Sequence, residues 1–426
     1  MLNSKPVVTF KAIGPEDWLG LFFGAWLLLT VLTPEYVYRT FFHLLIYPLA
    51  LYLLISKGGH LVAWKDPFVR LFVLFCGYMS VTTWLVGGGP ADNDFQASRW
   101  GIEAGLGMVA FFFWMLTLVQ RAAIWGRWFL IVALIGALAG FVSAQPEAVF
   151  NVRLQGLGAM AHPIQGASIA IAFLALGLFL TFHKANVATR KDGLLAVVSV
   201  VVVFSFVALT QSRAPLISLT AYLIGLSFIL GFQYRRLSAV CISLLAGICF
   251  LGLAFWLSDS ATIFDQLISR GASHRLELWS AYLGYPPESL LIGNGAGFDF
   301  SFTEASRLYL EPRGLGHIEH PHNLWLGAFS ETGLIGVVWQ AGLVLLPTVA
   351  VLRSRQALSV KLHLVALLGL FLLLTFSDEF TLLISLRPVW LFGWTLLIFV
   401  WTWTRYGEGE TATADFAVEP GDQKCR

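Results

Sequence analysis

Long uncharged runs of apolar residues constrain this chain more than any other feature of its sequence. Many of them reach the roughly 20 residues that a helix needs to cross the hydrocarbon core of a bilayer. Because backbone N–H and C=O groups in hydrocarbon must pair within the protein, each run is predicted to be a helix. Only 12% of the residues are charged, about half the share of an ordinary soluble domain. The chain is therefore predicted to be an all-α polytopic membrane protein.

Twelve membrane spans are expected, roughly at residues 17–33, 36–55, 67–87, 100–119, 128–145, 164–182, 194–210, 216–233, 238–257, 322–347, 362–377 and 388–404. The layout has four parts: residues 1–257 with nine spans, a long outer loop at 258–321, residues 322–404 with three spans, and a tail at 405–426. The tail is polar and is predicted to be disordered.

The distribution of basic residues predicts the orientation of these spans. With the N-terminus in the cytoplasm, 18 of the 27 Lys and Arg face the cytoplasm, which satisfies the positive-inside rule. An even number of spans then returns the C-terminus to the cytoplasm. The nine basic residues left on the outer side are all arginines: Arg39, Arg99, Arg153, Arg213, Arg270, Arg275, Arg307, Arg313 and Arg387. Some of them can snorkel or pair with acids, but guanidinium groups also bind phosphate oxygens bidentately.

The outer loop is long enough to suggest a function of its own. Within it, residues 274–285 are expected to form a short helix in the membrane interface, with Leu276, Trp279, Tyr282 and Leu283 toward lipid.

His322 is the strongest candidate for a catalytic residue. It follows Pro321, a residue suited to the first turn of a helix, so His322 and Asn323 are expected at a helix N-terminus. The positive end of the helix dipole there favours a neutral imidazole, which can accept a proton from a hydroxyl. A purely structural role as a helix cap is the alternative. The neighbouring His317, His320 and Glu319 also raise the less favoured possibility of a metal site.

Two arginines are candidates for binding an anion. Arg213 lies where the seventh span meets the outer leaflet, and a charge at that depth is costly unless it is paired or functional. Arg275 lies in the outer loop, although Glu277 could neutralise it. Arg153, in a glycine-rich outer turn, is a further candidate for the same ligand.

The spacing of these residues resembles the signature of the O-antigen ligase and polymerase superfamily. The resemblance covers roughly residues 150 to 345, and its elements appear in the expected order. They are Arg153-Leu-Gln-Gly, Thr210-Gln-Ser-Arg213, Arg275-Leu-Glu-Leu-Trp279 followed by Gly293-Asn-Gly, and His320-Pro-His-Asn323 followed by Glu331-Thr-Gly-Leu-Ile-Gly336.

The resemblance implies an all-helical GT-C-type membrane glycosyltransferase that needs no metal or other cofactor. Its donor would be an undecaprenyl-diphosphate-linked glycan, bound through the diphosphate by Arg213 and Arg275. His322 would activate the acceptor hydroxyl as the catalytic base, and Arg153, Asn323 and Trp279 would be possible substrate contacts. The site would face the periplasm from the bacterial inner membrane.

The acceptor distinguishes the branches of this superfamily. The favoured interpretation is transfer of O-antigen to lipid A–core, since the twelve-span layout and the His-Pro-His-Asn wording look more like that branch. A polymerase of repeat units and a pilin glycan ligase are the alternatives. A lipid-linked sugar transporter is disfavoured because the unusual charges gather at the outer surface. No nucleic-acid partner is expected, and membrane lipid surrounds the chain.

Overall fold

The computed structural model describes residues 14–56, 59–86, 94–144, 153–183, 189–234, 275–316, 318–376 and 386–407. Within these ranges every regular element is helical and no strand occurs. The prediction of an all-α chain is confirmed.

The helices that precede the long loop are α1 (Pro15–Leu32), α2 (Glu35–Phe41), η1 (Phe42–Ile46), α3 (Tyr47–Ser56), α4 (Gly59–Lys65), α5 (Pro67–Val86), α6 (Asp94–Gln120), α7 (Ala122–Ser143), η2 (Gly158–Met160), α8 (Pro163–Phe182), α9 (Arg190–Leu209) and α10 (Arg213–Tyr234). The later ones are α13 (Arg275–Gly284), η3 (Phe300–Phe302), η4 (Ser306–Leu310), η5 (Glu311–Arg313), α14 (Leu324–Arg353), α15 (Leu358–Phe376), η6 (Trp390–Trp394) and α16 (Thr395–Tyr406).

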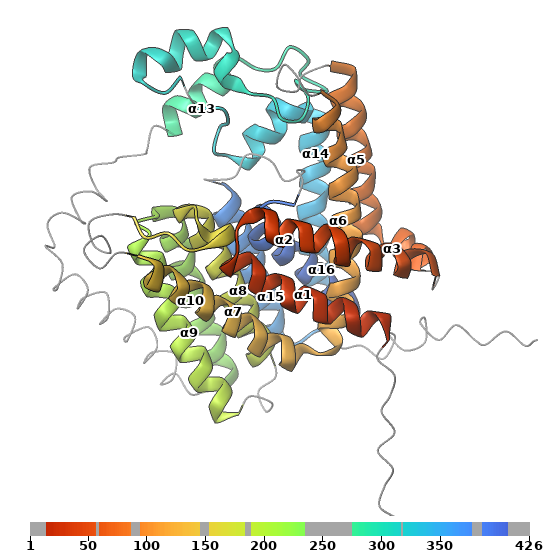
Figure 1. Cartoon of the computed structure of the whole chain (residues 1–426), viewed down its shortest axis with the longest axis vertical. Helices are drawn as coiled ribbons and strands as arrows, with labels where there is room; N and C mark the ends of the chain where they lie inside the picture. Colours follow the sequence, from red (N-terminus) through yellow and green to blue (C-terminus); the bar gives the residue numbers. More distant parts are fainter. Residues whose placement is uncertain are drawn as a thin grey trace, which may run out of the picture.

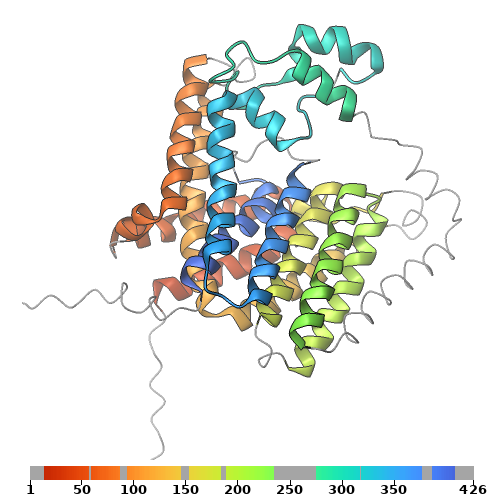
Figure 2. The same ribbon diagram turned by 180° about the vertical axis from the view of Figure 1, so that it is seen from behind.

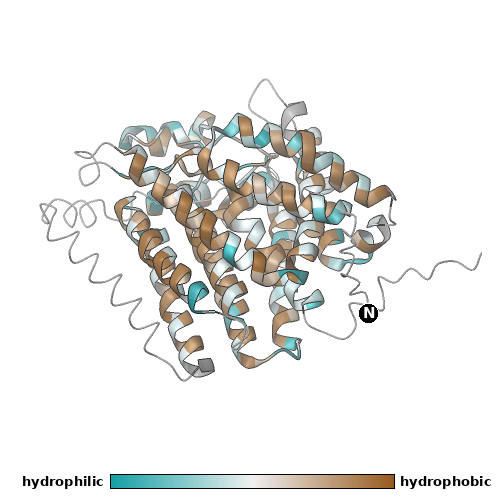
Figure 3. Cartoon of the chain, turned by 60° about the horizontal axis from the view of Figure 1, so that its bottom comes forward, coloured by the Kyte–Doolittle hydropathy of each residue, from teal (hydrophilic) through white to brown (hydrophobic). Residues whose placement is uncertain are grey.

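Ten helical stretches in the described part of the chain are long and apolar enough to cross a membrane. This finding confirms a polytopic membrane protein. The twelfth expected span corresponds to η6 and α16. The ninth expected span, residues 238–257, and the tail from residue 408 lie outside the described residues. Figure 3 shows that hydrophobic residues cover most of the helix lengths.

Helix α8 is the centre of the bundle. In its most apolar stretch 89% of the residues are buried, whereas the corresponding share in the other spanning candidates is 56% at most. Helices α7, α9, α10 and α15 pack around it. A second part of the core is aromatic: Phe23 of α1 stacks on Trp114 of α6 at a ring distance of 4.3 Å. The helices thus differ in how much of their surface is buried against other helices and how much is left to face lipid.

Helices α5, α6 and α14 stand side by side and reach a cap that lies at one end of the molecule (Figures 1 and 2). The cap comprises residues 275–316, with α13 and the turns η3 to η5. It has a small core of its own, made of Leu278, Ala281, Tyr282, Phe300, Ala305, Leu310 and Leu315. The cap therefore has its own small core in addition to its contacts with the helices below it.

Helix α14 is broken at Gly333, which separates a first half of nine residues from a longer second half. Gly333 has φ 64° and ψ −167°, a conformation that essentially only glycine adopts. A Cβ atom at this position would lie 2.3 Å from the carbonyl oxygen of Leu291. The sequence predicted one continuous span here, and the break is the main local departure from that prediction.

The glycine-rich loop at residues 290–297 pairs with the backbone groups that the break leaves free. Three carbonyls at the end of the first half accept hydrogen bonds of 2.9 Å: Ser330 from the Asn294 N–H, Glu331 from the Gly295 N–H, and Thr332 from the Tyr78 hydroxyl. At the start of the second half, the N–H groups of Leu334 and Ile335 donate to the carbonyls of Leu290 and Leu291. Because buried backbone groups need partners, the loop and the break form one unit.

Candidate active site

His322 lies directly before the first half of α14. The Asn323 side chain caps this helix, its Oδ1 atom accepting from the N–H groups of Trp325 (3.0 Å) and Leu326 (3.1 Å). His322 itself has a positive φ of 49°. Gln211 is the other non-glycine residue with positive φ in the described part of the chain. Backbone strain of this kind persists where the surroundings enforce it, and it gathers at functional sites.

The His322 ring is held in its neutral form. Burial is the largest cause, and the charges of His320, Arg275 and His162 add to it, lowering the pKa of His322 to about 3. The His320 ring lies 4.2 Å from the His322 ring, and burial lowers its pKa to about 4. The Nδ1 atom of His322 is buried without a hydrogen-bond partner among the described residues. A neutral imidazole with an unused nitrogen suits a general base.

One face of α13 holds the segment that leads to His322. Arg275, Trp279 and Tyr282 follow the spacing of a single helix face. The Trp279 indole N–H donates to the carbonyl of Pro321 (2.9 Å), and the Tyr282 hydroxyl donates to the carbonyl of Glu319 (3.1 Å). The expected short helix is present at Arg275–Gly284. Its residue Tyr282 is buried against Phe300 rather than facing lipid, whereas Leu276 and Leu283 are exposed.

Arg213 begins α10 directly after a tight turn at Thr210–Ser212. The Arg153 guanidinium binds this turn, with Nε donating to the Thr210 carbonyl (3.0 Å) and Nη2 donating to the Ser212 hydroxyl (2.9 Å). The next residue, Leu154, donates its N–H to the carbonyl of Leu209 (3.0 Å). Arg153 and Arg213 therefore belong to one local structure, although 60 positions separate them in the sequence.

Charge interactions link His322 with residues of α13 and of the segment before α8. Arg275 and His162 both lower the pKa of His322, and Arg153 adds to the effect of burial in lowering the pKa of His162. The base candidate, the arginine on α13 and the arginine beside the α10 turn thus lie around a common region. A positively charged region of this kind suits an anionic ligand.

Two of the possible substrate contacts already use polar atoms within the protein. Asn323 uses its side-chain oxygen as a cap, and Trp279 uses its N–H on Pro321. Sequence reasoning missed His162 and Tyr282 as neighbours of this region. A repeated His-Pro pair, at His162 and His320, was the available signal.

Among the described residues, no group of three His, Cys, Asp or Glu is placed so that it could hold a metal ion. His317, the third histidine of the possible metal cluster, lies outside the described residues.

The chain is similar to known proteins over much of its length. The family model of O-antigen ligase matches residues 197–339. An O-antigen ligase of Pseudomonas aeruginosa (strain PAO1) is 25% identical over 333 residues, which cover 77% of this chain and 75% of that protein. The family match runs from α9 through the break in α14, and it includes Arg213, Arg275 and His322.

Proposed function

This polytopic membrane protein carries the domain of the O-antigen ligase superfamily, and we propose that it transfers a glycan from a lipid-linked diphosphate to an acceptor hydroxyl. The observation that carries the proposal is the neutral, strained His322 beside Arg275, at the edge of a cap that covers one end of the helices. A transferase of this class requires a base for the hydroxyl and fixed cations for the diphosphate, roles that His322 and the two arginines, Arg213 and Arg275, would fill.

The reaction that fits is a single in-line displacement. The acceptor oxygen attacks the anomeric carbon while the bond from that carbon to the diphosphate oxygen breaks, which inverts the anomeric configuration. The hydroxyl proton passes to the His322 imidazole, and the bonding electrons leave with the diphosphate. Arg213 and Arg275 stabilise the charge that grows on the leaving group. No metal enters the proposed mechanism, because the guanidinium groups supply the positive charge.

The substrates are those that the family resemblance implies. We propose an undecaprenyl-diphosphate-linked glycan as the donor and lipid A–core as the acceptor. The protein would lie in the bacterial inner membrane with both termini in the cytoplasm and the cap, the outer loop of the predicted layout, in the periplasm. The positive-inside distribution of Lys and Arg supports this orientation.

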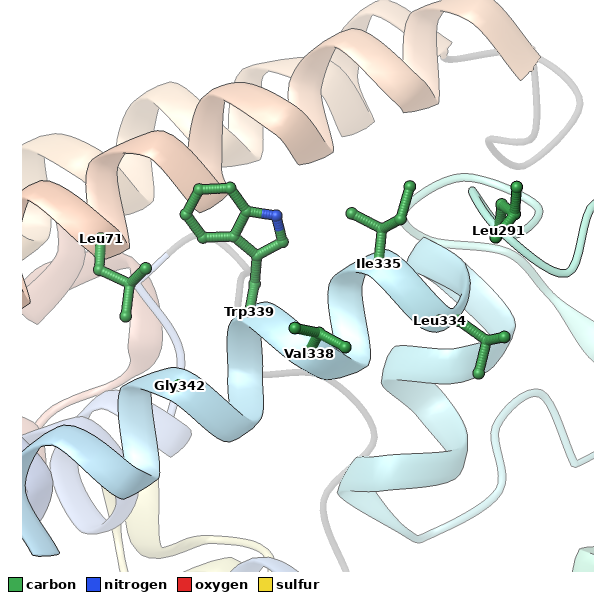
Figure 4. Close-up of a pocket in the computed structure, with 7 residues that line it drawn as sticks. All are labelled: Leu71, Leu291, Leu334, Ile335, Val338, Trp339 and Gly342. Atoms are coloured by element: carbon green, nitrogen blue, oxygen red, sulfur yellow. The ribbon is translucent and has the colours of Figure 1, made fainter. Parts of the chain in front are cut away.

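An apolar groove of about 600 Å³ supports a lipid-linked donor. It is lined by Leu71, Leu291, Leu334, Ile335, Val338, Trp339 and Gly342 (Figure 4). The groove begins where the first half of α14 ends, so a short helix separates it from His322. We propose that part of the carrier's hydrocarbon chain occupies it, held by van der Waals contact with these apolar side chains.

The test is complementation of a gene deletion with wild type, His322→Ala or His43→Ala, followed by size analysis of surface glycans and of the undecaprenyl-linked pool. We expect the deletion to leave long glycan on the carrier and bare lipid A–core. Wild type and His43→Ala should restore capped lipid A–core, whereas His322→Ala should not. His43 is the matched control because its ring nitrogen binds the carbonyl of Arg39, four residues before it, and the proposed mechanism gives it no role.

Two results would contradict the proposal. Survival of single repeats alone, on carrier or on core, would identify a polymerase. Restoration by His322→Ala at normal protein level would exclude His322 as the base.

A further inference from the structure

The turn at Thr210–Ser212 is both strained and buried. Gln211 has φ 51°, a value that is uncommon for a residue with a side chain. Thr210, Gln211 and Ser212 are all buried. A polar, strained turn in such a place persists only when its neighbours fix it.

Arg153 supplies the contacts that fix this turn from both sides of Gln211. One guanidinium N–H binds the carbonyl of Thr210 and another binds the hydroxyl of Ser212. The Ser212 hydroxyl in turn donates a hydrogen bond to the carbonyl of Thr210 (3.3 Å). The planar fork of arginine can span two acceptors at once, which the single ammonium of lysine does less well.

The geometry of the turn decides where α10 begins. Arg213 is the first residue of α10, and the helix continues from the Ser212 carbonyl, which accepts from the Leu216 N–H at 3.1 Å. A rotation of the Ser212 backbone would therefore move the Arg213 guanidinium, which lies at the end of a long side chain. A small misplacement of a binding group has a large effect on a preorganised site.

We propose that Arg153 is a positioning residue: it fixes the turn before α10 so that Arg213 reaches the diphosphate, and it does not itself bind the donor. This inference rests on the proposed function. It also changes the expectation from the sequence, in which Arg153 contacted the same ligand as Arg213.

A double-mutant cycle tests the proposal, using purified full-length protein in liposomes with an undecaprenyl-diphosphate-linked glycan donor. The variants are Arg153→Ala, Arg213→Ala and the double variant, and the measurements are kcat and the donor KM. We expect Arg153→Ala to raise the donor KM about tenfold in the wild-type background and less than about twofold in the Arg213→Ala background, because coupled residues are not additive. Equal effects in both backgrounds would show that Arg153 binds the donor directly and would overturn the proposal.

Two further variants separate positioning from general loss of structure. Ser212→Ala removes one acceptor of the Arg153 fork, so it should raise the donor KM by about threefold in the wild type and have no effect in Arg153→Ala. Arg153→Lys can keep one of the two bonds, so its donor KM should lie between the values of wild type and Arg153→Ala. An Arg153→Lys protein with the wild-type donor KM would contradict the role of the fork.

The same preparations distinguish the two levels of inference. If wild-type protein neither binds the undecaprenyl-diphosphate-linked glycan nor transfers the glycan from it, the proposed function fails. If wild type does both and the cycle is additive, only the role of Arg153 fails.

Discussion

Two residues with strained backbones, Gln211 and His322, mark the two sides of the candidate site. Gln211 stands two residues before Arg213, which is proposed to bind the diphosphate, and His322 is the proposed base. The strain of such a residue is of order 1–3 kcal/mol. Hydrogen bonds to the neighbouring carbonyls offset this strain: Arg153 donates to the carbonyl of Thr210, and Trp279 donates to the carbonyl of Pro321. The site is thus preorganised by residues that need not touch substrate.

The lowered pKa of His322 leads to a prediction about pH. Because burial, and after it the charges of His320 and Arg275, hold this pKa at about 3, the neutral base form persists as the pH falls through 6.5, where a free imidazole is protonated. The acid limb of kcat/KM for the donor should therefore lie below about pH 5. Initial rates between pH 4.5 and 8.5 test this expectation, because they should show no acid limb above about pH 5. An acid limb of kcat/KM at pH 6 or above, unchanged in Arg275→Gln, would contradict the assignment of His322 as the base.

Trp279 allows a prediction about the position of the base. Trp279→Phe keeps an aromatic ring against Phe376, whose ring centre lies 5.7 Å away, but loses the bond to the Pro321 carbonyl. We expect kcat to fall about five- to tenfold with little change in the donor KM, since a net hydrogen bond is worth about 1 kcal/mol. Trp128→Phe is the control, because it loses an equivalent bond to the Gly24 carbonyl between α7 and α1. Equal losses in both variants would show that the effect is general destabilisation.

The sequence was sufficient to select His322, Arg213 and Arg275 as candidates because each stands in a short motif. It was not sufficient to show that Trp279 binds the Pro321 carbonyl or that Arg153 binds the Ser212 hydroxyl. These contacts join positions 42 and 59 residues apart, and nothing in local propensity encodes such a pairing. The pattern selected candidate residues, and the tertiary contacts of these residues are what it could not predict.

At the scale of elements, the broken helix α14 and the glycine-rich loop at residues 290–297 depend on each other. The apolar run from 322 to 347 predicted a span but not its break, because hydropathy carries no information on φ and ψ. Gly333 was visible only as one glycine in a motif. Its role became clear from the carbonyl of Leu291, which occupies the space that a side chain would need.

Replacement of Gly333 should therefore damage folding rather than chemistry alone. Gly333→Ala forces a Cβ atom to within 2.3 Å of the Leu291 oxygen at φ 64°, so we expect a loss of roughly 3 kcal/mol or more in stability. Gly369→Ala in α15 is the control, because a Cβ atom there meets nothing within 4 Å. Fluorescence-detected size exclusion after heating should show a lower melting temperature for Gly333→Ala only. A folded Gly333→Ala protein with wild-type melting temperature would show that the break is not required.

At the scale of the whole molecule, the number of apolar runs predicted the polytopic architecture well, since the bilayer sets the length of each span. The central place of α8 could not be predicted in the same way. Its run is no more apolar than that of α9, yet far more of it is buried. Small residues, such as Gly177 against Leu130 of α7, let neighbouring helices approach it closely. Hydropathy predicts which segments lie in the membrane, whereas packing determines which of them lie at the centre of the bundle and which face lipid.

The orientation of the molecule is the remaining prediction at this scale, and the proposed function depends on it. With the cap in the periplasm, Glu304→Cys in a cysteine-free background should react with a membrane-impermeant maleimide in intact spheroplasts. Ala357→Cys, in the connection between α14 and α15, should react only after lysis. Both positions are exposed, and the second half of α14, residues 334–353, which is about 30 Å long, separates the faces on which they lie. The opposite pattern of labelling would place His322 toward the cytoplasm, where a glycan already moved to the outer leaflet could not reach it.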